Sequence, residues 1–264
     1  MEYLGNLLKM NSFFSNPIEY TLVLGEHKIF MNELIDKTIS LKFLNKINCI
    51  RCGRETTKSF AQGFCFPCFR TAPETEECVL RPELCLAHEG SARDMVYAKT
   101  HCLIDHYVYL AFTSGIKVGV TRHTQIPTRW IDQGATLAVK LAKTPNRYLA
   151  GCIEVAMKAH FNDKTSWQKM LYAAATPENI MEIRAEALQK LPAEYSKFVV
   201  NETDPVPLNY PVLSVPDKLR SISLDKQAEI RDKMVAIKGQ YLVFESGKVI
   251  NIRKHNGYLI KMNF

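Results

Sequence analysis

Short runs of β-forming residues mark both ends of the chain. Near the N-terminus, strands are predicted over 20–24 and 39–43, and a turn at 25–27 leads into a further short run at 28–30. Near the C-terminus the predicted strands cover 240–244, 248–253 and 258–262, separated by Ser246-Gly247 and Asn256-Gly257, two pairs typical of hairpin turns. Neither set has enough strands to close a core by itself. We therefore predict that the two ends, residues 1–47 and 205–264, pair into one small β domain.

The centre of the chain has the pattern strand, strand, helix, strand, helix. Two β-forming runs, 107–112 and 116–121, are separated by a glycine-containing break of hairpin length. Pro127 stands where a helix should begin and Gly134 where it should end. Residues 135–141 are apolar at every second position, which predicts a third strand. A stripe of residues then recurs at helical spacing, namely Ile153, Met157, His160 and Phe161.

Two further helices are predicted to pack on this central unit, which we place at 106–204. Thr165 and Gln168 have the spacing of a capping box. Thr176-Pro177-Glu178 is typical of a helix start, and an apolar stripe follows from Ile180 to Leu191. The prolines beyond Asp204 predict an extended linker back to the β domain.

Composition narrows the functional classes. The chain has 264 residues, 47% of them hydrophobic, which is enough for a sizeable core and more than one domain. No apolar run reaches the roughly 18 residues of a membrane-spanning helix. The N-terminus lacks the pattern of a signal peptide, so a cytoplasmic location is expected and no membrane partner. A net charge of +7 is compatible with a polyanionic partner.

The cysteines predict a zinc-binding region over 48–105. Cys49 and Cys52 form one C-x2-C pair, and Cys65 and Cys68 form a second after twelve intervening residues. Two such pairs can present four thiolates tetrahedrally, the arrangement that structural Zn²⁺ favours. The alternatives are disulfides, which a chain without a secretory signal should not keep, and buried thiols without a ligand role.

A second cysteine cluster has looser spacing. Cys78 precedes Cys85 by seven positions, Cys85 and His88 form a C-x2-H, and Cys102 precedes the first central strand. We predict a second zinc site from these four residues, with His106 as the alternative fourth ligand. The competing interpretation is a set of reduced, partly buried thiols.

Motifs in the central unit resemble two known groups of proteins. Tyr107-Val108-Tyr109, Lys117-Val118-Gly119, Arg129 on the first helix and Glu154 on the second resemble the GIY-YIG nuclease superfamily, in its branches with KIG or KVG. The longer motifs HYVYLA, KVGVTR, PTRWIDQGA and GQYLVF resemble the family called DUF2797 over nearly the whole chain. The implied fold is α+β, with a GIY-YIG-like β-β-α-β-α domain preceded by a zinc region.

The superfamily resemblance implies a hydrolase that cuts a phosphodiester. In such enzymes a first-motif tyrosine, here Tyr109, helps to activate water, the helix arginine stabilises phosphate charge, and the glutamate holds Mg²⁺ or Mn²⁺. The predicted catalytic set is Tyr109, Lys117, Arg129, Glu154 and His106, with Glu154 as the ligand of the divalent metal. The predicted contacts to DNA or RNA are Lys117, Arg122, His123 and Arg129.

One departure from the superfamily pattern keeps a second function open. Lys117 stands where the superfamily name has a tyrosine. The lysine either supplies a phosphate contact, lowers the pKa of a neighbouring tyrosine by its charge, or marks an altered or lost water-activating arrangement. Each predicted residue also has an ordinary structural interpretation: Tyr109 as a core aromatic, Arg129 and Glu154 as surface residues. The alternatives to a nuclease are therefore a catalytically silent DNA- or RNA-binding module and an adaptor stapled by zinc.

Overall fold

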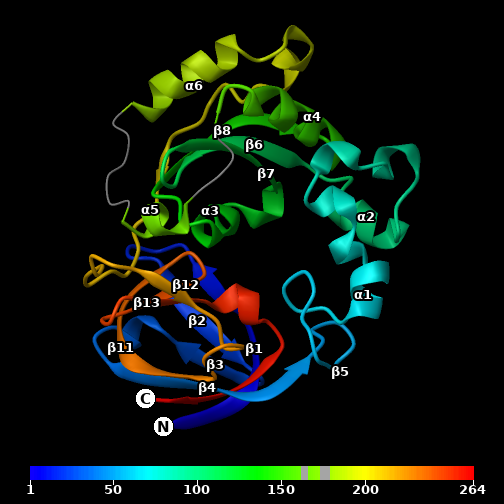
Figure 1. The fold of residues 1–264 in the computed structure, drawn as a ribbon. Helices are drawn as coiled ribbons and strands as arrows, with labels where there is room; N and C mark the ends of the chain where they lie inside the picture. The colour runs from blue at the N-terminus through cyan, green and yellow to red at the C-terminus, as the bar shows by residue number, and fades with distance from the viewer. Residues whose placement is uncertain (162–165, 173–178) are drawn as a thin grey trace. The chain divides into compact units, whose positions relative to one another are not determined.

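The chain is α+β, as predicted, and divides into two compact units. The computed structural model describes residues 1–161, 166–172 and 179–264 (Figure 1). Unit 1 comprises Met1–Arg70 and Asn209–Phe264, and unit 2 comprises Thr71–Leu208. The first cysteine cluster belongs to unit 1 and the second to unit 2. The zinc-binding region over 48–105 stays a prediction, and its residues are divided between the two units.

Unit 1 is built on one long sheet that both ends of the chain form together. Its strands are β1 (Glu2–Phe13), β2 (Glu19–Leu24), β3 (His27–Phe30), β4 (Thr38–Asn48), β5 (Glu55–Thr56), β10 (Arg220–Ile222), β11 (Glu229–Lys238), β12 (Tyr241–Phe244), β13 (Lys248–Asn251) and β14 (Tyr258–Asn263). In the part of the chain that the structure describes, their order is β10-β13-β12-β11-β4-β14-β1-β2-β3, with β5 on β4. The C-terminal strand β14 lies between the N-terminal strands β1 and β4. The predicted pairing of the two ends is confirmed.

Alternation along the strands explains why this sheet buries one face. Tyr20, Leu22 and Leu24 on β2 are fully buried, and the residues between them are partly exposed. The same period of two runs through β14, where every second residue is buried. Successive side chains of a strand point to opposite faces, so this pattern commits one face of each strand to the core.

One predicted hairpin is wrong. Asn256-Gly257 does not connect two paired strands, because β13 ends at Asn251 and a 3-10 turn, Ile252–His255, follows it. The amide of Gly257 donates to the carbonyl of Leu7, and β14 then pairs with β1 and β4. The turn buries Ile252 in the core, and pairing with two long strands replaces the short local hairpin.

Unit 2 holds a four-stranded sheet covered by helices on both faces. Within the described ranges its strand order is β7-β6-β8-β9, with β6 (His106–Phe112), β7 (Ile116–Arg122), β8 (Leu137–Thr144) and β9 (Val206–Pro207). Its helices are α2 (Met95–His101), α3 (Thr128–Asp132), α4 (Arg147–Lys158), α5 (Trp167–Tyr172) and α6 (Ile180–Gln189). Helix α1 (Phe66–Thr71) lies in unit 1 up to Arg70 and ends at the first residue of unit 2. The predicted order of strand, strand, helix, strand, helix is confirmed.

The two faces of this sheet carry different helices. Val108 and Leu110 on β6 belong to a core cluster with Ile153 and Met157 of α4, which α6 completes through Ile180 and Ala187. Tyr109, between them, points to the other face and meets Trp130 of α3 edge to face. The sheet therefore separates α3 from α4 (Figure 1). Side chains from both helices can meet at the edge of the sheet, where no further strand lies between them.

Some element boundaries differ from the prediction. Helix α4 ends at Lys158, before His160 and Phe161, and β8 begins two residues later than expected. Thr165 and the predicted helix start at Thr176 lie outside the described residues. Among the described residues, no helix is long and apolar enough to cross a membrane.

Candidate functional site

The four cysteines of the first cluster come together at the end of β4. Cys49 follows that strand, and a tight turn brings Cys52 back, with the amide of Gly53 donating to the Cys49 carbonyl at 2.9 Å. Cys65 and Cys68 lie just before and within α1. All four sulfurs lie within 4.8 Å of one another, and those of Cys52 and Cys65 are 3.8 Å apart. Sulfurs about 2.3 Å from one zinc ion lie about 3.8 Å apart, so the donor set fits zinc.

The backbone around this cluster favours the thiolate form of Cys49 and Cys52, whereas burial raises the pKa of Cys68 to about 12. Burial opposes ionisation of Cys49, but hydrogen bonds from the backbone amides of Cys65, Cys52 and Arg51 outweigh it and lower its pKa to about 6. A hydrogen bond from the backbone of Arg54 lowers the pKa of the Cys52 thiol. Because zinc binds the thiolate form, these backbone donors prepare the cluster for a metal.

The second cluster joins three cysteines in unit 2. Cys78 lies in a short 3-10 turn (Glu77–Val79), Cys85 follows another (Pro82–Leu84), and Cys102 follows α2. Their sulfurs lie within 4.8 Å of one another and all three side chains are buried. The Nη1 atom of the buried Arg147 donates to the Cys78 sulfur at 3.5 Å. A guanidinium in this place offsets the negative charge of three thiolates, so the set can hold a metal ion.

Neither predicted histidine lies with these three sulfurs. The ring of His88 stacks on Tyr148, with 4.3 Å between ring centroids. The Nδ1 atom of His106 lies 2.7 Å from the Ile104 carbonyl, and burial lowers the pKa of His106 to about 4. The described residues therefore bring three possible ligands together here, one fewer than a tetrahedral zinc site takes.

A polar pocket of about 190 Å³ lies at the edge strand β7 of unit 2. Tyr109 reaches it from the α3 face of the sheet, and Glu154 reaches it from α4 on the opposite face. The lining residues are Val79, Leu80, Pro82, Tyr109, Lys117, Val118, Gly119, Val120, Arg129, Gln133, Glu154 and Lys158. The structure therefore gathers four of the five predicted catalytic residues around one space.

Gly119 sets the position of Tyr109 in this pocket. A Cβ atom at Gly119 would lie 2.6 Å from the Tyr109 hydroxyl, so only glycine lets the phenol ring cross the neighbouring strand. The Nε2 atom of Gln133, one turn after Arg129 on the α3 side, donates to that hydroxyl at 2.7 Å. Burial raises the pKa of Tyr109, which is therefore a neutral phenol that can donate its own proton.

The charged groups of the pocket have shifted pKa values. Burial, with the charge of Arg129 as a smaller cause, lowers the pKa of Lys117 to about 8. Burial raises the pKa of Glu154, although the ammonium group of Lys158, 3.5 Å away, opposes that shift. Three cations and one carboxylate converge here, which leaves a net positive site suited to a phosphate.

The remaining predicted residues lie elsewhere in unit 2. His106 is three positions before Tyr109 on β6. Arg122 is the last residue of β7 and His123 follows it, beyond the β7 residues that line the pocket, 117–120. None of the three lines the pocket. Arg122 is partly buried, and this burial lowers its pKa. Sequence reasoning missed Gln133 and Lys158, although each follows a predicted residue by four positions, the spacing that places two side chains on one helix face.

Comparison with family models decides the classification. Residues 36–260 match the model described as "Protein of unknown function (DUF2797)". The chain belongs to this family. The match confirms the resemblance carried by the longer motifs, and the DUF2797 description states no activity. No curated protein matches the chain, and no solved structure matches it. The pocket beside β7 and the two cysteine clusters are therefore the guide to the activity of this DUF2797 protein.

Proposed function

We propose that this DUF2797 protein is a divalent-metal-dependent nuclease that hydrolyses a phosphodiester in the pocket beside β7. The observation that supports this most is the convergence of Lys117, Arg129 and Lys158 on Glu154 and Tyr109. The pocket is smaller than the roughly 300–1,000 Å³ typical of small-molecule sites. That size suits one phosphate of a polymer. The order of elements implied by the GIY-YIG resemblance supports the same proposal.

Lys117 is the group we assign to water activation. At a pKa of about 8, roughly one lysine in ten is a free amine at pH 7, which can accept a proton from water. The hydroxide equivalent attacks phosphorus, the bond from phosphorus to the leaving oxygen breaks, and a proton reaches that oxygen from solvent. Tyr109 is too deeply buried to ionise readily, so it orients the attacked phosphate as a donor. Arg129 pairs with the phosphate oxygens.

Glu154 is the residue that would hold Mg²⁺ or Mn²⁺. A buried carboxylate is a hard oxygen ligand, and Mg²⁺ is often bound by one or two carboxylates together with substrate phosphate and water. The pocket offers one carboxylate among its described lining, so the phosphate itself would complete the site. When bound, the metal supplies charge neutralisation at the phosphate and stabilises the leaving oxygen. The cysteine clusters have a separate role as structural zinc sites in a reducing, cytoplasmic compartment.

Cleavage of a labelled panel tests the proposed function. The panel contains single-stranded, duplex and branched DNA and RNA, each incubated with Mg²⁺ or Mn²⁺. We expect wild-type protein to cut at least one member, and Arg129→Ala to cut it about a hundredfold more slowly because phosphate charge is no longer neutralised. Arg220→Ala, which changes an exposed arginine of unit 1, is the matched control.

Binding separates the outcomes of this panel. Folded, zinc-loaded protein that binds nucleic acid in a salt-sensitive way but cuts no member would replace the nuclease with a silent binding module. Protein that neither cuts nor binds nucleic acid would favour the third function, an adaptor whose fold is held by zinc.

The pH profile of cleavage tests the role of Lys117. The base form of an amine accumulates above its pKa, so the wild-type rate should rise tenfold per pH unit below about pH 8 and then level off. Lys117→Met should be about 10²- to 10⁴-fold slower and should lack this rise. Lys169→Met, at an exposed position of α5, should keep the wild-type profile. An unchanged profile in Lys117→Met would remove lysine from the mechanism.

A further inference from the structure

The loop between Cys78 and Cys85 forms one wall of the pocket. Val79, Leu80 and Pro82 all line it, and the two flanking cysteines belong to the second cluster. The loop is closed by its own backbone bonds: the amide of Arg81 donates to the Glu77 carbonyl at 3.0 Å. This wall is a short loop whose two ends carry cysteines of one cluster that can hold a metal ion.

The same loop lies directly on α4. A Cβ atom at Gly151 would be 2.2 Å from the amide nitrogen of Glu83 and 2.4 Å from the carbonyl carbon of Pro82. The glycine therefore lets the loop backbone touch the helix three residues before Glu154. Arg147, four residues before Gly151 on the same helix, contacts Cys78. The metal cluster, the loop and the helix that carries Glu154 are one packed assembly.

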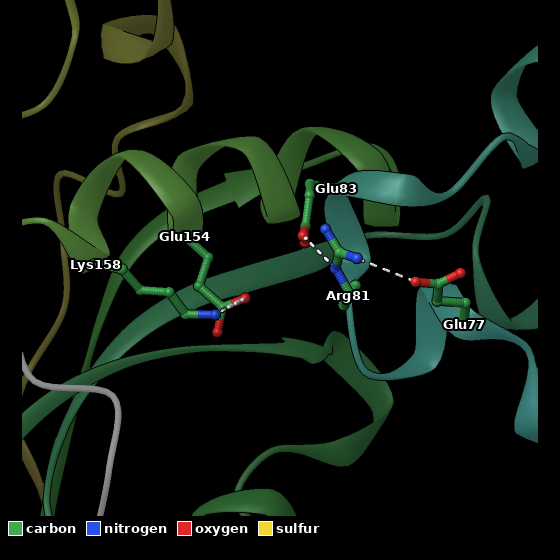
Figure 2. A network of polar contacts seen from close by, with 5 residues as sticks. All are labelled: Glu77, Arg81, Glu83, Glu154 and Lys158. Atoms are coloured by element: carbon green, nitrogen blue, oxygen red, sulfur yellow. Dashed lines mark hydrogen bonds and ion pairs between the residues drawn. The ribbon is translucent and has the colours of Figure 1, made fainter.

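The charged side chains of this loop pair with one another. Figure 2 shows Arg81 between Glu77 and Glu83, with Glu154 and Lys158 on the neighbouring α4. The guanidinium lies 3.1 Å from the Glu77 carboxylate and 3.3 Å from that of Glu83. Arg81 is the one cation between Cys78 and Cys85, and it is paired with these two carboxylates. The loop therefore presents apolar side chains to the pocket rather than a phosphate contact.

The apolar groups are unusually exposed for their type. Leu80 is 86% and Val79 is 40% exposed, at the rim of a pocket that charged side chains also line. A phosphate in the pocket would place its neighbouring sugar and base at that rim. Apolar side chains there match the face of an unstacked base, and similar wedges separate base steps in other nucleic-acid complexes.

We propose that this loop is a metal-held wall that selects nucleic acid with an unpaired nucleotide beside the scissile phosphate. Val79 and Leu80 pack against that nucleotide, and a metal ion on Cys78, Cys85 and Cys102 fixes the loop against α4. The inference rests on the proposed function, because it places the scissile phosphate in the pocket.

Equilibrium binding tests the apolar contact. Full-length Glu154→Gln protein, which should bind without cutting, is titrated with a labelled duplex carrying one unpaired nucleotide and with the fully paired duplex. Adding Leu80→Ser should weaken binding of the first about tenfold, because a leucine contact of this kind is worth at least 1.4 kcal/mol, and leave the second within about twofold. Leu86→Ser, at another exposed leucine outside the pocket, is the matched control.

The outcomes separate this inference from the proposed function. Failure of both duplexes to bind would overturn both. Binding that Leu80→Ser does not alter, or alters equally for both duplexes, would overturn the selective wall alone. Leu80 is exposed, so its substitution should not prevent folding.

Metal content and hydrogen exchange test the anchoring. Cys85→Ser should lose one equivalent of zinc per chain, and the amides of residues 79–84 should lose protection while those of the unit 1 sheet keep theirs. Unchanged zinc content or unchanged protection would overturn the metal-held loop, whatever the activity of the variant.

Discussion

Glu154→Gln should abolish cleavage while the protein stays folded and keeps its affinity for nucleic acid. Among the described residues that line the pocket, Glu154 is the one carboxylate. Glutamine has the same shape but no charge, so it cannot hold a divalent ion or neutralise Lys158. We expect a rate at least about 10³-fold below wild type, since charge stabilisation by the metal contributes several kcal/mol, with the dissociation constant changed less than about threefold.

The control and the pH dependence sharpen this test. Glu182→Gln, at an exposed position of α6, should cut like wild type. Burial raises the pKa of Glu154, so it becomes protonated at a higher pH than an ordinary glutamate, and cleavage should fall as pH drops through that value. Cleavage that survives Glu154→Gln would show that the activity lies outside this pocket.

Cys65→Ser should remove one zinc ion and loosen the segment that contains the first cluster. The free energy of zinc binding to four thiolates contributes to the folding free energy of the chain that carries them. This contribution is on the order of 10 kcal/mol in small zinc domains. The segment from Cys49 to Cys68 has little regular structure besides the two-residue β5 and the start of α1. A metal on the four sulfurs would add to a small set of other constraints, such as the packing of Phe60 against Phe66 and Phe69. We expect a loss of more than about 4 kcal/mol in the stability of unit 1.

Elemental analysis and thermal unfolding measure this effect. Wild-type protein purified without chelator should carry two equivalents of zinc per chain, and Cys65→Ser should carry one. Cys152→Ser is the matched control, because Cys152 is a free thiol on α4 that belongs to neither cluster. Wild-type protein without zinc would contradict the interpretation of both clusters.

The elements of unit 2 could be predicted because their signals are local. Each signal lies within a short stretch of sequence: the glycine-containing turn, Pro127 and Gly134 at the helix ends, and the change in the spacing of apolar residues from two to about four. The structure has the elements in that order. Element boundaries are not set by local spacing alone: α4 stops at Lys158 although the helical spacing runs on to Phe161. The hairpin predicted at Asn256-Gly257 does not form, because β14 gains two long partners that no local pattern indicates.

The sequence by itself determined the α+β class, the family, the cysteines of both clusters and four of the residues that line the pocket. Each depends on a spacing or motif within a short stretch. Only the tertiary structure decided what surrounds those residues. It placed the loop from Val79 to Leu84 against Gly151, brought Arg147 rather than a histidine to the second cluster, and buried Lys117 enough to lower its pKa. These features depend on packing between segments tens of residues apart, and on the water that this packing excludes.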